Sequence, residues 1–300
     1  MLTSTPASTT TSLELPAERH ESQLAETWRR LRRHRAAMLG LAVLGAFAVL
    51  AVGVQFVSPY DPLKQLLRDS LMDPSLEHPF GTDYLGRDIL TRMMYGARYS
   101  LSIGFGAVAI GLAIGVPLGA VSGYYGRWVD LVIQRFVDIL LSFPGILLAL
   151  SLVATLGPGV NNVVFSVGIS SMPNFVRLTR ASTLSIKTMA YVEAAQCLGA
   201  GNRRIIFLHV LRNAMAPVIV QATLSLGSAI LVAAGLGFLG LGVQPPTPEW
   251  GTMLGEGKDY IFSNPNMATF PGLAVFLAVL AFNLVGDGLR DALDPRLHRR

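Results

Sequence analysis

The chain has 300 residues, of which 51% are hydrophobic and only 14% are charged. A soluble globular domain has about a quarter charged residues, so this composition excludes an ordinary soluble protein and indicates a polytopic membrane protein. The single cysteine, Cys197, excludes an internal disulfide.

The N-terminal region has a polar part followed by a basic part. The first 21 residues are rich in Ser and Thr and lack hydrophobic periodicity, which predicts a disordered tail at 1–21. The run WRRLRRHR follows at 28–35. Such a run can bind nucleic acid, but its position directly before an apolar stretch favours a membrane anchor that contacts anionic headgroups. The net charge of +5 therefore requires no nucleic-acid partner.

Five stretches contain no charged residue, and each exceeds the roughly 20 apolar residues with which a helix crosses a bilayer. They are 36–60, 99–126, 139–176, 213–248 and 260–286. The third is too long for one crossing and contains the turn signal Gly157-Pro158-Gly159. We expect a helical hairpin there, with arms near 139–156 and 161–178. The chain is thus predicted to be an all-α polytopic membrane protein with six transmembrane helices.

The distribution of Lys and Arg predicts the orientation. Six spans place both termini on one side of the membrane, and that side has eighteen of these residues against six on the other. Cytoplasmic loops carry the excess of Lys and Arg, so both termini and the long connection at 177–213 are predicted to be cytoplasmic.

Sequence signatures of catalysis are absent. The chain has no GxxxxGKS/T, HExxH, CxxC or GxSxG pattern, and its five histidines are scattered, so we expect no catalytic, cofactor or metal site. The middles of the spans also lack Asp, Glu and His, which disfavours a proton-driven transporter. Sodium coupling through backbone carbonyls remains open. If the chain moves a solute uphill, the energy is expected to enter from another subunit.

The 177–213 connection contains a polar segment that such a subunit could hold. Tyr191 to Leu198 favours a short helix, which Gly199 or Gly201 can end in the left-handed conformation of a C-cap. Arg203 to Leu211 can form a second short helix. Two short helices at an angle predict a compact knob, residues 191–211, with the Glu193 carboxylate as a localised charge.

The segment EAAQCLGAGNRRIIFLHVLRNAMAP at 193–217 resembles the EAA loop of ABC importer permeases. In that family the loop is a coupling helix that docks in a groove of the ATP-binding subunit. The resemblance implies docking by these residues: Glu193, Ala194, Ala195, Gly199, Ala200, Gly201, Arg203, Arg204 and His209. Peptide-type members commonly have Pro-Asn where this chain has Arg212-Asn213, which leaves the exit from the second helix open. A helical hairpin without a partner is the alternative.

Three further stretches, at 78–101, 236–254 and 282–297, look like the permeases for oligopeptides, dipeptides and nickel. The resemblance covers about 22–297 and is closest to the C-type permease of such importers. It implies a type I ABC importer permease fold in the bacterial cytoplasmic membrane. The expected partners are a homologous second permease, two ABC ATPase subunits that hydrolyse the ATP, and an extracytoplasmic solute-binding protein.

The expected organisation follows from this resemblance. A basic anchor, the first span and an extracytoplasmic segment occupy 22–96, a five-helix permease core occupies 97–287, and a cytoplasmic tail occupies 288–300. The expected function is a non-catalytic half of a path for short peptides, with glutathione or nickel chelates as alternative substrates. A stand-alone secondary transporter and a membrane scaffold are the alternatives of another class.

Two outer segments allow both a structural and a functional interpretation. In GTDYLGRD at 81–88, Thr82 or Asp83 can cap the helix that enters the second span, and Asp88 can pair with Arg92. Alternatively, these residues lie beside the binding protein: Asp83, Arg87 and Asp88.

The glycines at the end of the fifth span indicate tight packing or a flexible outer gate: Gly235, Gly237, Gly240 and Gly242. Trp250 is expected in the interfacial aromatic belt. Pro144 lies within the third span, where freed carbonyl groups could face a water-filled path or simply pack.

Overall fold

The computed structural model describes residues 23–293, and their regular structure is helical, which confirms the all-α prediction. The predicted tail at 1–21 and most of the tail at 288–300 lie outside these residues. The α-helices are α1 Gln23–Arg33, α2 Arg35–Val57, α3 Ile89–Tyr125, α4 Arg127–Leu141, α5 Gly145–Leu156, α6 Val160–Ile186, α7 Ala190–Cys197, α8 Asn202–Arg204, α9 Arg212–Phe238, α10 Trp250–Gly257 and α11 Asn266–Leu293. The shorter elements are the 3₁₀ turns η1 Leu67–Asp69 and η3 Lys258–Tyr260 and the π-helix η2 Ile205–Leu211.

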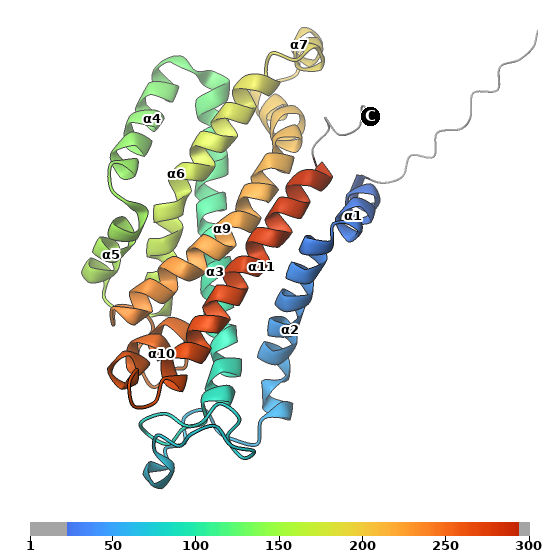
Figure 1. The fold of residues 1–300 in the computed structure, drawn as a ribbon. Coiled ribbons are helices and arrows are strands. Elements are labelled where there is room, and N and C mark those ends of the chain that lie inside the picture. The colour runs from blue at the N-terminus through green and yellow to red at the C-terminus, as the bar shows by residue number, and fades with distance from the viewer. Residues whose placement is uncertain (1–22, 294–300) are drawn as a thin grey trace, which may run out of the picture.

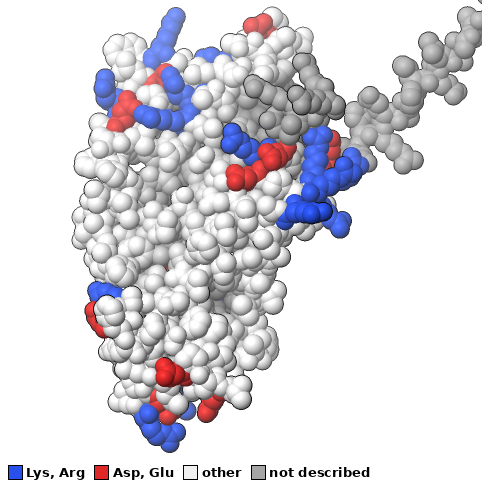
Figure 2. All heavy atoms as spheres, viewed as in Figure 1, with Lys and Arg blue, Asp and Glu red and all other residues white. Residues whose placement is uncertain are grey.

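The long helices run between two ends of the molecule (Figure 1). One end, the knob end, holds α1, α7 and the last turns of α11. The other end, the cap end, holds a cap that we define as residues 58–92, which include the first turn of α3, and 239–265, which include α10. Charged side chains gather toward these ends and leave most of the face between them uncharged (Figure 2). This distribution suits a helical bundle that crosses a bilayer.

The length and composition of the helices identify most of the predicted membrane spans. Within residues 23–293, four helices are long and apolar enough to cross: α2, α3, the continuous helix 202–238, and α11. The pair α4 and α5, bent by 86° at the break before Pro144, is a fifth if the two helices form one broken span and not a re-entrant loop. The prediction of one helical arm at 139–156 is therefore wrong, because Pro144 cannot continue α4 and instead directly precedes α5. Helix α6 also joins the two ends in Figure 1, but its Asn and Ser residues make it less apolar, so six crossings stay a prediction.

The core is built on the close approach of α3 and α6. A Cβ atom at Gly119 of α3 would lie 2.5 Å from the carbonyl oxygen of Val176 on α6, so only glycine permits this spacing. Fully buried Ile103, Phe175 and Ile230 fill the space between α3, α6 and α9. Helices α3 and α6 thus form the centre against which α9 packs, and α11 packs in turn between α9 and α2.

Candidate functional site

The first half of the knob is a short helix with a glycine-dependent end. Helix α7 ends at Cys197, and Gly199 follows with a φ of 82°. The Gly199 N–H donates to the Gln196 carbonyl at 2.9 Å, and the Ala200 N–H donates to the Ala195 carbonyl at 3.0 Å. These two bonds form a Schellman motif, so the prediction that Gly199 ends the helix is confirmed.

Gly201 has a different role. Its φ is −68°, and it directly precedes α8. The alternative in which Gly201 supplies the left-handed C-cap is therefore wrong.

The second half of the knob corrects the sequence prediction. Arg203 to Leu211 was expected to be a separate short helix, but α8, η2 and α9 continue without a break from Asn202 to Phe238. Arg212 lies inside this continuous helix, which answers the question of how the second helix exits. Residues 202–211 contain no Gly or Pro that would interrupt the helix. The π-helical turns of η2 lie where the knob joins the span, and such turns frequently mark functional positions.

The inner side of the knob is packed and hydrogen-bonded. A buried cluster joins α7 to the start of the long helix and consists of Ile186, Val192, Ile205, Val210 and Ala214. The Asn213 amide donates to the Tyr191 hydroxyl at 2.9 Å and to the His209 carbonyl at 2.7 Å. The knob is thus firmly attached to α9, so a displacement of α7 must move α9 as well.

The outer side of the knob is open to a partner. Six of the expected docking residues are exposed: Glu193, Ala194, Gly199, Gly201, Arg203 and Arg204. Three are half-buried: Ala195, Ala200 and His209. No ion pair joins the Glu193 carboxylate or the two arginines to another residue within 23–293.

Two apolar residues on the same surface escaped the sequence analysis. Leu198 is 88% exposed and Phe207 is 63% exposed. Both lie on the knob, at the charged end of the molecule and not on the apolar band between the ends. Exposed apolar side chains among charged ones indicate a surface that binds another protein. The available signal was a leucine placed directly before a turn glycine.

The corner between α3 and α4 supports the knob from the side. The Tyr124 hydroxyl donates to the Asn202 side-chain oxygen at 2.9 Å, and the Lys187 ammonium donates to the Gly123 carbonyl at 2.8 Å. In the same corner, Arg180 of α6 donates two hydrogen bonds of 2.6 Å to Asp130 of α4. The knob is therefore continuous with α9 and contacts α3 through Tyr124, while Lys187 joins the end of α6 to α3.

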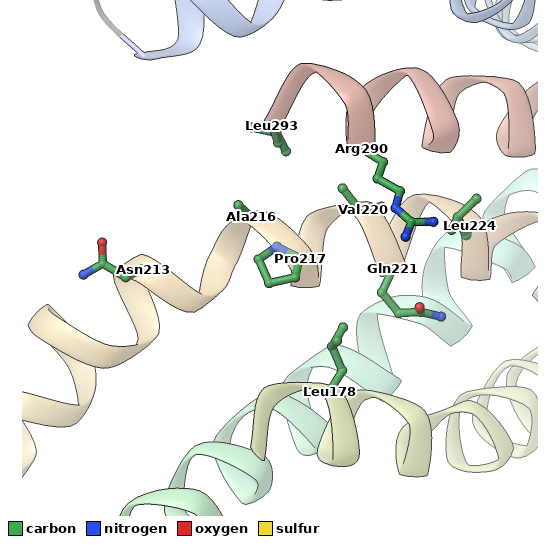
Figure 3. A pocket seen from close by; sticks show the side chains of 9 residues that line it. All are labelled: Leu178, Asn213, Ala216, Pro217, Val220, Gln221, Leu224, Arg290 and Leu293. Atoms are coloured by element: carbon green, nitrogen blue, oxygen red, sulfur yellow. The ribbon is translucent and has the colours of Figure 1, made fainter. Parts of the chain in front are cut away.

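A cavity of about 550 Å³ lies beside the knob end of α9. Figure 3 shows Leu178 extending from α6 and Arg290 from α11 toward α9. The complete lining is Leu178, Asn213, Ala216, Pro217, Val220, Gln221, Leu224, Arg290 and Leu293. Asn213 belongs to both the cavity wall and the hydrogen bonds of the knob. The cavity was not predicted, because its walls come from three helices that are distant in sequence.

At the cap end, the glycine cluster is mostly a packing feature. A Cβ atom at Gly237 would lie 2.8 Å from the Glu249 carboxylate, and one at Gly242 would lie 2.5 Å from the Cα atom of Gly237. Gly240, with a φ of 78°, closes α9 in a second Schellman motif. Gly235 has only an ordinary contact, 3.6 Å from Ile146. The packing interpretation therefore holds for Gly237 and Gly242, while the gate stays a prediction.

Trp250 was expected at the membrane interface, and this expectation is wrong. Its side chain is only 1% exposed, and its ring centre lies 5.1 Å from that of Phe47. The indole N–H donates to the Met93 carbonyl at 3.0 Å. Trp250 thus joins α10 to α2 and α3 inside the protein.

The start of α3 also differs from the expectation. Its cap is Asp88, which accepts a hydrogen bond of 2.7 Å from the Thr91 N–H, and not Thr82 or Asp83. Asp88 also lies 3.0 Å from the His78 ring nitrogen. Because the cap position points the carboxylate back at the helix end, the predicted Asp88–Arg92 pair does not form.

Arg92 and Arg87 instead enter a buried network of charges in the cap. The Glu256 carboxylate lies 3.0 Å from the Arg92 guanidinium and 3.3 Å from that of Arg87, and Arg87 also donates to Asp83 at 2.5 Å. Both arginines are only 1% exposed. Burial and the Glu256 charge raise the pKa of the Tyr84 phenol, which donates to Glu256 at 3.3 Å.

This network bears on the suggested binding-protein contact. Asp83, Arg87 and Asp88 are all buried, so their charges are used to hold the cap together. A binding-protein contact in this region stays a prediction, and it would fall on the exposed parts of the cap.

Two family models match the chain, one over its C-terminal part and one over its N-terminal part. Residues 115–299 match the family described as "Binding-protein-dependent transport system inner membrane component". Residues 22–74 match the "N-terminal TM domain of oligopeptide transport permease C". The second match covers the anchor, the first span and the beginning of the cap.

Similar proteins and structures agree with these matches. The chain is 47% identical over 272 residues to a dipeptide transport system permease of Alkalihalophilus pseudofirmus, covering 91% of this chain and 90% of that protein. It is 48% identical over 274 residues to a glutathione transport system permease of Pectobacterium atrosepticum, covering 91% of each.

A similar fold occurs in an inward-facing structure of the MetNI methionine ABC transporter, with a TM-score of 0.56 and 20% identity. The alignment covers 69% of this chain and 98% of that one. The fold is thus that of type I ABC importer permeases, as expected. The chain belongs to the family of binding-protein-dependent transport system inner membrane components, as a permease subunit of an ABC importer.

Proposed function

We propose that this chain forms one half of a translocation path for short peptides in an ATP-driven importer. The observation that carries the proposal is the knob, whose outer face is exposed and which is fixed to a continuous helix running to the other end of the molecule. The similarity to a dipeptide permease supports the substrate class. A homologous permease would supply the other half of the path.

The knob end faces the cytoplasm in this proposal, in agreement with the distribution of Lys and Arg. Two ABC ATPase subunits bind and hydrolyse the ATP, and the exposed face of the knob docks on one of them. The chain itself does no covalent chemistry. A solute-binding protein delivers the peptide at the cap end. The permease core is proposed to occupy about 97–287, although α3 begins at Ile89 and α11 continues to Leu293.

Motion passes through α9. When the ATPase moves the knob, the hydrogen bonds of Asn213 and the cluster around Val192 make α9 follow. Because α9 ends beside the cap, the same displacement changes the packing at Gly237. The bundle then alternates between openings at its two ends, with the 86° break between α4 and α5 as a second flexible point.

The decisive experiment is co-purification from native membranes in mild detergent through a tagged C-terminus. The proposal expects a homologous permease and two P-loop ATPases, and cells that lack the chain should lose uptake of a labelled dipeptide. Recovery of the chain alone, repeated in lipid nanodiscs, together with undiminished uptake, would contradict it. That result would favour a stand-alone transporter or a scaffold.

Glutathione is the second candidate substrate, because a glutathione permease is as similar to the chain as the dipeptide permease. Competition separates the two candidates. Glutathione is the substrate if unlabelled glutathione at low concentration abolishes uptake of the label while a hundredfold excess of unlabelled dialanine leaves that uptake unchanged. The reverse pattern supports peptides.

A further inference from the structure

The cavity beside α9 contains one charge, the guanidinium of Arg290, within an otherwise uncharged wall. No hydrogen bond or ion pair joins Arg290 to another residue among those that the structure describes. The nearby acid Asp291 lies 3.5 Å from His34, on the side of α1. The side chain of Arg290 extends from α11 toward α9, while that of Gln221 extends from α9 toward α6 (Figure 3). Among residues 23–293, the cavity therefore offers a solvent-exposed cation that no ion pair engages.

Two amides complete the polar part of the wall. The Gln221 amide N–H donates to the Ser225 hydroxyl at 3.2 Å, which leaves the Gln221 carbonyl oxygen as a hydrogen-bond acceptor. The Asn213 amide N–H group is already used within the knob. The cavity thus pairs a cationic donor with a neutral acceptor in an apolar surround.

The chemistry of this wall fits a small molecule with a carboxylate and an N–H group. A planar guanidinium binds a carboxylate through two parallel hydrogen bonds. A volume of about 550 Å³ lies within the range of small-ligand sites. A zwitterionic dipeptide has both groups.

We propose that this cavity is a binding site for the transported solute near the cytoplasmic end of the path, in which Arg290 takes the terminal carboxylate and Gln221 accepts an N–H. The site rests on the proposed function. It also has a physical connection to the knob, because Asn213 of the cavity wall donates hydrogen bonds to Tyr191 and His209. A solute that leaves the path would make its last contacts here.

The test uses the full complex, purified with its second permease and ATPases, in nanodiscs without nucleotide or binding protein. Equilibrium binding is measured for labelled dialanine and for dialanine amide, which keeps the ammonium but has no carboxylate. The wild-type complex should bind the acid about tenfold more tightly than the amide, the effect of one charge-assisted pair. In Arg290→Gln the ratio should fall to about one, and in Arg290→Lys it should be intermediate.

The matched control is Arg212→Gln, because Arg212 is exposed at the same end of the molecule but does not line the cavity. This variant should keep the wild-type ratio. Equal affinity for acid and amide in the wild type, no measurable binding to an intact complex, or an unchanged ratio in Arg290→Gln would each overturn the site. Reduced co-purification of phosphatidylglycerol in Arg290→Gln, without any acid preference, would overturn it in favour of a lipid headgroup.

The experiment separates the two proposals. A complex that contains the ATPases but shows no preference for the acid contradicts the cavity site alone. A chain that never co-purifies with ATPases contradicts the proposed function. Wild-type binding is informative even if an Arg290 variant fails to assemble.

Discussion

The knob and the cap use the same helix-ending device in opposite surroundings. Gly199 in the knob and Gly240 in the cap both have a positive φ and both close a Schellman motif. In the knob, the charged residues Glu193, Arg203 and Arg204 are exposed and have no ion partner within residues 23–293. In the cap, Arg87 and Arg92 are buried and paired with carboxylates.

This difference in how the charges are satisfied corresponds to two structural roles, binding a partner and keeping a fixed shape. A surface that must bind a partner keeps its charges and its apolar side chains exposed until the partner covers them. A surface that must keep its shape satisfies its charges internally, although removing such charges from water is costly. The exposed charges of the knob agree with the docking role proposed for it, whereas the paired charges of the cap favour a fixed shape. The following variants test this contrast, beginning with the largest effect.

Glu256→Gln should be strongly destabilising. It removes the carboxylate charge that faces both Arg92 and Arg87, while Asp83 stays beside both; breaking a buried pair outright costs about 3–5 kcal/mol, and this partial loss should cost near the lower end of that range. The midpoint of thermal unfolding of the purified complex should fall clearly. Asp259→Asn is the control, because Asp259 is exposed in the same segment and should change stability by at most about 0.5 kcal/mol. Equal effects of the two variants would contradict the buried network.

Gly237→Ala and Gly235→Ala separate packing from gating. A Cβ atom at Gly237 meets the Glu249 carboxylate and the α10 backbone at 2.8 Å, so overpacking should cost about 1–3 kcal/mol. At Gly235 the nearest atom is 3.6 Å away, and the variant should be nearly neutral in stability. Transport that fails equally in both variants, without loss of stability in Gly235→Ala, would show that glycine flexibility matters and would support the outer gate.

The sequence predicted the features that depend on local signals. Runs of uncharged residues located the helices, and the EAA pattern with Gly199 located the knob and its turn. The cap network could not be predicted, because Arg92 and Glu256 are 164 positions apart and nothing local indicates their pairing. Trp250 was misplaced for the same reason, since its burial depends on Phe47 and Met93. Local patterns indicate elements, whereas burial depends on packing between elements.

Gly199→Val tests whether the turn of the knob matters for docking. Nothing lies within 4 Å of a Cβ atom at Gly199, so the cost comes from its φ of 82° and should be about 1–2 kcal/mol. Recovery of the ATPases should fall, while membrane insertion stays normal. Gly45→Val is the control, because Gly45 lies in α2 outside the knob, its φ is not positive, and a Cβ atom there also meets nothing within 4 Å. Unchanged recovery in Gly199→Val would contradict this account of the knob.

Leu198→Ala should have the smallest effect and the most specific one. The side chain is 88% exposed in the isolated chain, so its removal should leave stability unchanged. If the ATPase covers Leu198, the loss of that contact should weaken docking by about 1 kcal/mol, or roughly fivefold. Titration of the purified ATPase onto the permease pair in nanodiscs measures this. Leu239→Ala is the matched control, because Leu239 is also exposed, at 58%, but follows α9 at the cap end. Weaker docking in both variants would mean that the loss does not depend on contact at the knob. The proposed contrast between an exposed knob that docks and a cap that does not would then be contradicted.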